Sequence, residues 1–256
     1  MPTPRLIILG SSAGLASAHR AASCYLLDLG DFGIMIDCGD GATRNFLFAG
    51  HRPEWVSHIL ISHTHADHVC GLLYFIQQRY LARTENPLTI YCARESIAAL
   101  RQMLAFGHLY PEAMPFETMI VPIQPQNSRT VGGVALDAYP TSHLVRQRAF
   151  AAEHGYPDSG DCYAFRMQLG GKSLLYSADL GSLADLNVVT GPIDSLLIET
   201  SHVDLEMLWP WAEDRGITRI ILTHLSDDFD TSQLTLAAKF TAAEIIIAED
   251  GMSLDL

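Results

Sequence analysis

The stretch from Ile59 to His68 reads ILISHTHADH, an apolar run that passes directly into a cluster of polar side chains. Residues two apart in an extended chain point to the same side, so His63 and His65 can share one metal ion. A turn after them brings Asp67 and His68 into the same region, where they can serve a second ion. Neutral imidazoles and a carboxylate suit Zn²⁺, Mn²⁺ or Fe²⁺. The cluster predicts a metal site rather than a surface loop, because without a ligand role it would leave costly polar groups at a strand end.

Two metal ions need more ligands than these four, and the sequence offers them after later apolar runs. His143 lies within TSH, Asp179 within SADLG and His224 within ILTHLS. Ligands at strand ends sit on a rigid scaffold, which fixes the coordination geometry. Taken singly, each has an ordinary alternative: a loop histidine, a helix N-cap aspartate, or a core histidine with satisfied hydrogen bonds. Their occurrence together with the first cluster favours metal ligation.

The composition is that of a globular chain. Of the 256 residues, 48% are hydrophobic and 18% are charged, which excludes a disordered chain or a coiled coil. No internal repeat or linker is visible, so we expect one domain over residues 1–256. The five cysteines are scattered, which argues against a disulfide framework or a zinc ribbon.

Charge and hydropathy exclude further classes. The chain has 16 Lys and Arg against 29 Asp and Glu, a formal net charge of −13 that opposes non-specific binding to nucleic acid. No apolar run reaches the roughly 18–20 residues that span a bilayer. The apolar stretch Leu6–Leu9 ends at Gly10 and is too short for a signal peptide. We therefore expect a cytoplasmic protein with no membrane partner.

Short apolar runs alternate with helical candidates in a layered α/β pattern, with two sheets covered by helices. Strands are expected at 6–9, 24–27, 33–37, 58–62, 88–92, 118–123, 133–138, 162–168, 173–177, 195–200, 219–223, 244–248 and 252–256. Helices are expected at 41–48, 69–81, 94–106, 204–213 and 231–241.

The motif HTHADH resembles the H-x-H-x-D-H signature of the metallo-β-lactamase superfamily. The later TSH, SADLG and LTHLS segments resemble the remaining metal motifs of that superfamily, in the same order, and the resemblance covers nearly the whole chain. The opening LGSSAGLASAHRAASCYLLDL, the following MIDCGDGATRNFL and the closing AEDGMSLDL resemble the ribonuclease Z and phosphodiesterase branch. The resemblance implies an α/β fold, a four-layer αββα sandwich with the metal ions at one edge.

The resemblance also implies which residues hold two divalent ions, with Zn²⁺ expected and Mn²⁺ or Fe²⁺ compatible. His63, His65 and His143 would hold the first, Asp67, His68 and His224 the second, and Asp179 would bridge them. Two cations about 3.5–4 Å apart can share a hydroxide and clamp a substrate oxygen. Their local positive charge would attract an anionic phosphate despite the acidic surface.

The candidate catalytic residues are Asp67, His202 and Glu199. His202, in LLIETSH, resembles the non-ligand histidine that phosphodiesterases of this branch use as a proton donor, and Glu199 could orient it. The alternative is that His202 caps the following helix or is simply exposed. Asp37 and Asp40 are expected to orient ligating histidines, although turn chemistry in D-C-G-D-G explains Asp40 nearly as well.

Two departures argue against tRNA as the substrate. Ribonuclease Z enzymes carry a Gly/Pro-rich arm between the third metal motif and the bridging aspartate, used to grip tRNA. Here 36 positions separate His143 from Asp179, and residues 144–161 leave room for a loop but not for an arm. The family's His-Glu-Ala-Thr motif reads Ile198-Glu199-Thr200-Ser201. The acidic balance points the same way.

The leading hypothesis is therefore a dinuclear metal-dependent phosphodiesterase acting on a small or cyclic nucleotide-like phosphodiester through a metal-bridging hydroxide. An arylsulfatase, lactonase or thioesterase on the same fold is the alternative enzyme, since fold cannot decide between them. A metal-binding accessory protein without catalysis is the alternative outside the enzymes. The expected partner is a small-molecule substrate, and a homodimer is common among relatives.

Overall fold

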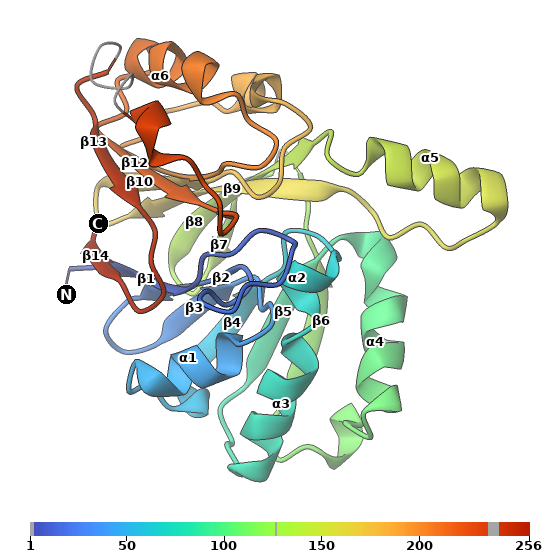
Figure 1. Ribbon diagram of the computed structural model, residues 1–256. Helices are drawn as coiled ribbons and strands as arrows, with labels where there is room; N and C mark the ends of the chain where they lie inside the picture. Colours follow the sequence, from blue (N-terminus) through green and yellow to red (C-terminus); the bar gives the residue numbers. More distant parts are fainter. Residues whose placement is uncertain (1–2, 126, 235–240) are drawn as a thin grey trace.

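The computed structural model describes residues 3–125, 127–234 and 241–256, whose strands form two seven-stranded sheets (Figure 1). In spatial order, the first sheet holds β14 (Ser253–Asp255), β1 (Arg5–Gly10), β2 (Cys24–Asp28), β3 (Gly33–Ile36), β4 (Val56–Leu60), β5 (Leu88–Cys92) and β6 (Thr118–Pro122). The second sheet holds β13 (Glu244–Ile247), β12 (Arg219–Thr223), β11 (Ser195–Glu199), β10 (Lys172–Tyr176), β9 (Cys162–Leu169), β8 (Val134–Thr141) and β7 (Arg129–Val131).

Each sheet has an antiparallel half and a parallel half. From β14 through β3 the neighbours of the first sheet pair antiparallel, and from β3 to β6 they pair parallel. In the second sheet β7 to β10 pair antiparallel and β10 to β13 pair parallel. Parallel neighbours need long crossover connections, and these carry most of the helices.

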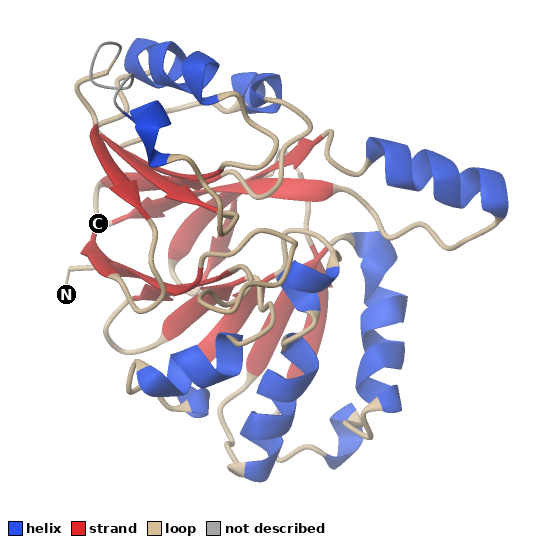
Figure 2. Cartoon of the chain, in the orientation of Figure 1, coloured by secondary structure: helices blue, strands red, loops and turns tan. Residues whose placement is uncertain are grey.

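Helices cover the outer faces of both sheets (Figure 2). The first sheet is covered by α1 (Ala42–Phe48), α3 (Leu72–Leu81) and α4 (Ile97–Phe106), and the second by α6 (Leu205–Asp214). Two further helices are α2 (Ala66–Val69) and α5 (Val145–His154). Short 3-10 helices lie at η1 (Pro53–Trp55), η2 (Arg94–Ser96), η3 (Pro111–Ala113), η4 (Leu183–Val188) and η5 (Thr231–Gln233).

Strands β2, β3, β5 and β11 are buried along their whole length and carry continuous apolar runs, as strands covered on both faces do. Strand β8 instead alternates between buried and more exposed residues. On β1, Leu6 and Ile8 face the second sheet, whereas Ile7 and Leu9 face the helices. The core between the sheets therefore lies between two further apolar layers, one under each set of helices. This arrangement is the expected four-layer αββα sandwich.

The structure corrects the expected helix over residues 69–81: Val69 is the last residue of α2, and α3 begins at Leu72. They are separated at Gly71, where an added Cβ atom would lie 2.1 Å from the carbonyl oxygen of Gly39. Close backbone contact at this point turns the chain and leaves α2 as a separate short helix that begins beside the HTHADH motif. Strand β7 was not expected, because its three residues are too short to give a pattern.

The expected loop over residues 144–161 is largely helical. Helix α5 has no buried residue and projects away from the sandwich (Figure 1). It ends at Gly155, whose φ of 73° is left-handed, and Arg148 binds both Asp158 and Asp161 in the return segment. Sequence periodicity missed the helix because it buries no apolar face. Most of the expected helix 231–241 lies outside the described residues.

Two expectations about composition can be compared with the structure. All five cysteines are free, and four of them are buried. Among the helices of the described residues, none combines the length and the apolar character needed to cross a membrane.

Candidate metal centre

The seven predicted ligands converge at one edge of the sandwich, where strands from both sheets end. The first sheet supplies His63 and His65 after β4, with Asp67 and His68 on α2. The second sheet supplies His143 after β8, Asp179 after β10 and His224 after β12. Their ligand atoms form two groups in which every atom lies within 4.8 Å of the others. The first group holds His63, His65, His143 and Asp179, and the second holds Asp67, His68 and His224.

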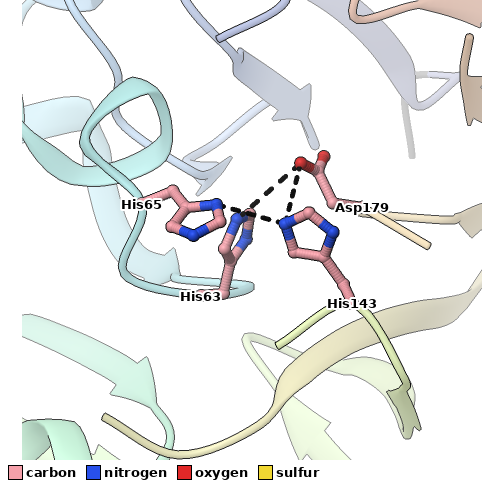
Figure 3. Close-up of side chains that lie close together, drawn as sticks. All are labelled: His63, His65, His143 and Asp179. Atoms are coloured by element: carbon pink, nitrogen blue, oxygen red, sulfur yellow. Dashed lines mark hydrogen bonds and ion pairs between the residues drawn. The ribbon is translucent and has the colours of Figure 1, made fainter. Parts of the chain in front are cut away.

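In the first group the donor atoms point toward a common centre (Figure 3). The Nε2 atom of His143 lies 3.1 Å from Nδ1 of His65 and 3.4 Å from Oδ2 of Asp179. The Nε2 atom of His63 lies 3.8 Å from the same Asp179 oxygen. Three imidazole nitrogens and one carboxylate oxygen therefore face one another at spacings that suit ligands around one ion.

The second group is organised around Asp67, whose Oδ2 atom lies 3.3 Å from Nε2 of His68 and 3.2 Å from Nε2 of His224. Asp179 reaches this group too, through its other oxygen: Oδ1 lies 3.3 Å from Nε2 of His68 and 3.7 Å from Nε2 of His224. One carboxylate thus presents one oxygen to each group, which is the arrangement that a bridging ligand requires.

Several of the candidate metal-ligand atoms lack hydrogen-bond partners. Among the described residues, Nε2 of His63, Nε2 of His68 and Oδ1 of Asp179 are buried without one. A buried polar atom left without a partner costs about 1–3 kcal/mol. Three such atoms within a few ångströms fit divalent cations, and the imidazole and carboxylate donors match Zn²⁺, Mn²⁺ or Fe²⁺.

The pKa shifts at the centre suit metal ligands. Burial lowers the pKa values of His63, His65 and His143, which keeps them neutral as metal ligands must be. Burial alone would raise the pKa of Asp179, but the charge of His68 holds it well below its usual range. Burial likewise opposes the high pKa of His68, which Asp179 and Asp37 maintain.

His202 lies beside both groups. Its ring centroid is 4.9 Å from that of His143 and 6.3 Å from that of His224. Glu199, at the end of β11, is 1% exposed, and its carboxylate lies 3.2 Å from Nδ1 of His202. That hydrogen bond raises the pKa of His202. The histidine is thus a partly exposed, readily protonated group at the edge of the metal centre.

The two aspartates of D-C-G-D-G differ. Asp37 is fully buried, and its Oδ2 atom lies 2.8 Å from Nδ1 of His68. Asp40 is exposed, and its carbonyl oxygen accepts a hydrogen bond from the backbone of Ala22. Among the described residues, no hydrogen bond joins the Asp40 side chain to a candidate ligand, whereas Asp37 is placed to orient one. No signal in the sequence pointed to Ser62 and Ser201, whose hydroxyl oxygens lie 3.1 Å from Nδ1 of His63 and 3.0 Å from Nδ1 of His224. None pointed to Tyr176 either, whose hydroxyl donates to Asp37.

Comparison with known proteins gives a family and a fold. Residues 4–231 match the family model described as Anti-Pycsar protein Apyc1. A ribonuclease Z of Archaeoglobus fulgidus is 23% identical over 98% of this chain and 97% of its own length. The probable metallo-hydrolase YhfI of Bacillus subtilis is 25% identical over 86% of each chain.

Solved structures agree with the fold. The metallo-β-lactamase fold protein YhfI of Bacillus subtilis superposes with a TM-score of 0.79 at 22% identity, covering 98% of this chain and 99% of its own. The short form of human tRNase Z gives a TM-score of 0.72 at 18% identity, covering 98% of each chain. The expected metallo-β-lactamase sandwich is confirmed.

Proposed function

The chain belongs to the Anti-Pycsar protein Apyc1 family of metallo-β-lactamase-fold hydrolases, and we propose that it is a dinuclear phosphodiesterase acting on a small or cyclic nucleotide-like phosphodiester. The observation that carries the proposal is Asp179, which presents one carboxylate oxygen to each group of donors. His63, His65 and His143 would hold one ion, and Asp67, His68 and His224 the other, with Zn²⁺ the expected metal.

When bound, two divalent ions supply a hydroxide nucleophile at neutral pH and charge stabilisation for a phosphoryl oxygen. They add +4 to the formal charge of −13, leaving −9, and place that positive charge at one edge of the sandwich. A phosphate monoanion or diester is therefore attracted to this edge although the remaining surface is acidic.

The chain's own residues supply the proton transfer. We assign His202 as the general acid that protonates the leaving oxygen, because its pKa is raised and its ring borders both groups. Glu199 holds the imidazole through Nδ1, which would leave Nε2 free to face the substrate. Asp67 would have two roles: its Oδ2 atom faces the other members of the second group, and its Oδ1 atom would accept a hydrogen bond from the hydroxide nucleophile.

The charge around α5 supports a small substrate rather than tRNA. Residues 145–161 carry two arginines against one glutamate and two aspartates. Arg148 is held by Asp158 and Asp161 and is not free to bind a phosphate backbone. A projecting helix of this charge offers little of the phosphate attraction on which nucleic-acid affinity depends.

The proposal is tested with purified protein reloaded with Zn²⁺ or Mn²⁺, with a chelated sample as control. We expect metal-dependent turnover of bis(p-nitrophenyl) phosphate, followed by turnover of 3′,5′-cyclic mononucleotides when the four bases are screened. Asp179→Asn should abolish both, whereas His154→Ala, on exposed α5, should change neither. Hydrolysis of a lactone, a thioester or an aryl sulfate in place of phosphodiesters would establish the alternative enzyme. Two bound ions without turnover of any ester would establish an accessory protein.

A further inference from the structure

The carboxylate of Asp37 is a buried hub of hydrogen bonds at the end of β3. It is 0% exposed and accepts four donors: the backbone N–H of Ser62 at 2.7 Å, the Ser62 hydroxyl at 2.8 Å, the Tyr176 hydroxyl at 2.7 Å and Nδ1–H of His68 at 2.8 Å. Its φ of 55° lies in the left-handed region, which an aspartate adopts at a cost. Such strain persists where the surroundings hold the residue in place, as four donors do here.

Asp37 contacts the second group of candidate ligands through His68. Because Asp37 accepts the hydrogen on Nδ1, it leaves Nε2 of His68 to face Asp67 and Asp179. A rotation of the ring would remove that nitrogen from the centre.

The hub reaches the first group through Ser62. The Ser62 hydroxyl donates its only hydrogen to Asp37, and its oxygen lies 3.1 Å from Nδ1 of His63. That oxygen can then only accept a hydrogen bond from His63, which places the hydrogen on Nδ1 and leaves Nε2 to face Asp179.

We propose that Asp37 is a positioning residue shared by both metal groups, acting directly on His68 and through Ser62 on His63. The inference rests on the proposed dinuclear centre. Tyr176, from the second sheet, supplies the fourth donor, and Asp179 follows it by three positions. The hub therefore ties the sheet that carries His63 and His68 to the sheet that carries the bridging carboxylate, so one side chain aligns ligands of both ions.

The test measures metal binding rather than turnover. Apo protein is titrated with Zn²⁺ against a chelator, which gives the stoichiometry and both dissociation constants. Asp37→Asn tolerates the left-handed backbone but offers one neutral oxygen to four donors. We expect this substitution to raise the dissociation constants of both ions about 10–100-fold. Ser62→Ala should weaken one ion and leave the other unchanged.

Ser173→Ala is the matched control. Ser173 is 2% exposed and donates both its N–H and its hydroxyl to Asp194, each at 2.8 Å, at the opposite end of β10 from Asp179. Ser173→Ala removes a buried serine hydroxyl that donates to an aspartate, as Ser62→Ala does, but away from the metal centre. Both Zn²⁺ dissociation constants should therefore stay as in the wild type.

Three results overturn the inference: Asp37→Asn weakens one ion or neither, Ser62→Ala weakens both equally or neither, or Ser173→Ala matches Ser62→Ala. If Asp37→Asn does not fold by circular dichroism, the comparison of Ser62→Ala with Ser173→Ala decides. A wild-type protein that binds fewer than two ions would instead refute the dinuclear centre itself, and the shared hub with it.

Discussion

Replacing Glu199 by glutamine tests how the chain prepares His202 for proton transfer. The buried carboxylate accepts hydrogen bonds through Oε2 from the backbone N–H groups of Ser201 at 2.6 Å and His202 at 2.8 Å. Through Oε1 it meets the backbone N–H of Leu180 at 3.3 Å and Nδ1 of His202 at 3.2 Å. Glutamine retains the shape and one oxygen, which can keep the two shorter bonds. Its NH2 group then replaces the negative oxygen that faces the imidazole.

The magnitude follows from that lost contact. A hydrogen bond to a charged group contributes about 1.5–3 kcal/mol. Because 39% of the His202 side chain is exposed, solvent screens the interaction, and we take a value just below that range, about 1.4 kcal/mol. That free energy corresponds to about a tenfold change in an equilibrium constant. The hydrogen bond from Glu199 raises the pKa of His202 in the wild type, so Glu199→Gln should lower that pKa.

The assay is the pH dependence of kcat with a 3′,5′-cyclic mononucleotide, whose alkoxide leaving group needs a proton. Activity that requires protonated His202 is lost as the pH rises through its pKa, so the alkaline limb of Glu199→Gln should lie at a lower pH than that of the wild type. Bis(p-nitrophenyl) phosphate releases a stable phenolate and should show little change. An unchanged alkaline limb would refute the reasoning, as would an equal shift with both substrates at unchanged metal content.

Three further predictions concern stability and metal binding. Each ion present at 100 times its dissociation constant adds about 2.7 kcal/mol to the free energy of unfolding. Adding Zn²⁺ to the metal-free protein should therefore raise its melting temperature by about 10 °C or more. A melting temperature that does not depend on Zn²⁺ would contradict the metal centre. Arg79 is 0% exposed and donates to the carbonyl oxygens of Pro53, Val56 and Asn86, so Arg79→Met should lower the free energy of unfolding by about 3 kcal/mol or more in a denaturant titration. A loss below about 1 kcal/mol would show that these carbonyls find other donors. In Gly39→Ala the new Cβ atom would lie 2.1 Å from the carbonyl oxygen of Asp67, which should displace α2 and weaken Zn²⁺ binding in a chelator competition. If Zn²⁺ affinity were unchanged, α2 would not depend on this close approach.

Much of this protein can be inferred from sequence because its ligands lie next to strong local patterns. The apolar run before His63 predicts a strand, and the run of histidines and aspartate after it predicts ligands at the strand's end. Strands buried on both faces leave continuous apolar runs, which gives the layered α/β class. Local pattern fails where an element buries nothing, as in α5, or where a backbone contact interrupts a helix, as Gly71 does between α2 and α3.

The sequence by itself determined the fold class, the edge of the sandwich where the ligands gather, and the seven side chains that form the candidate centre. Only the tertiary structure decided how these side chains are held. Asp179 offers one oxygen to each group because it follows β10 of the second sheet and lies between the two groups of candidate ligands. Ser62 and Tyr176 meet at Asp37 from opposite sheets, although 114 positions separate them in the chain. No spacing encodes such a contact, because it depends on how two sheets pack face to face.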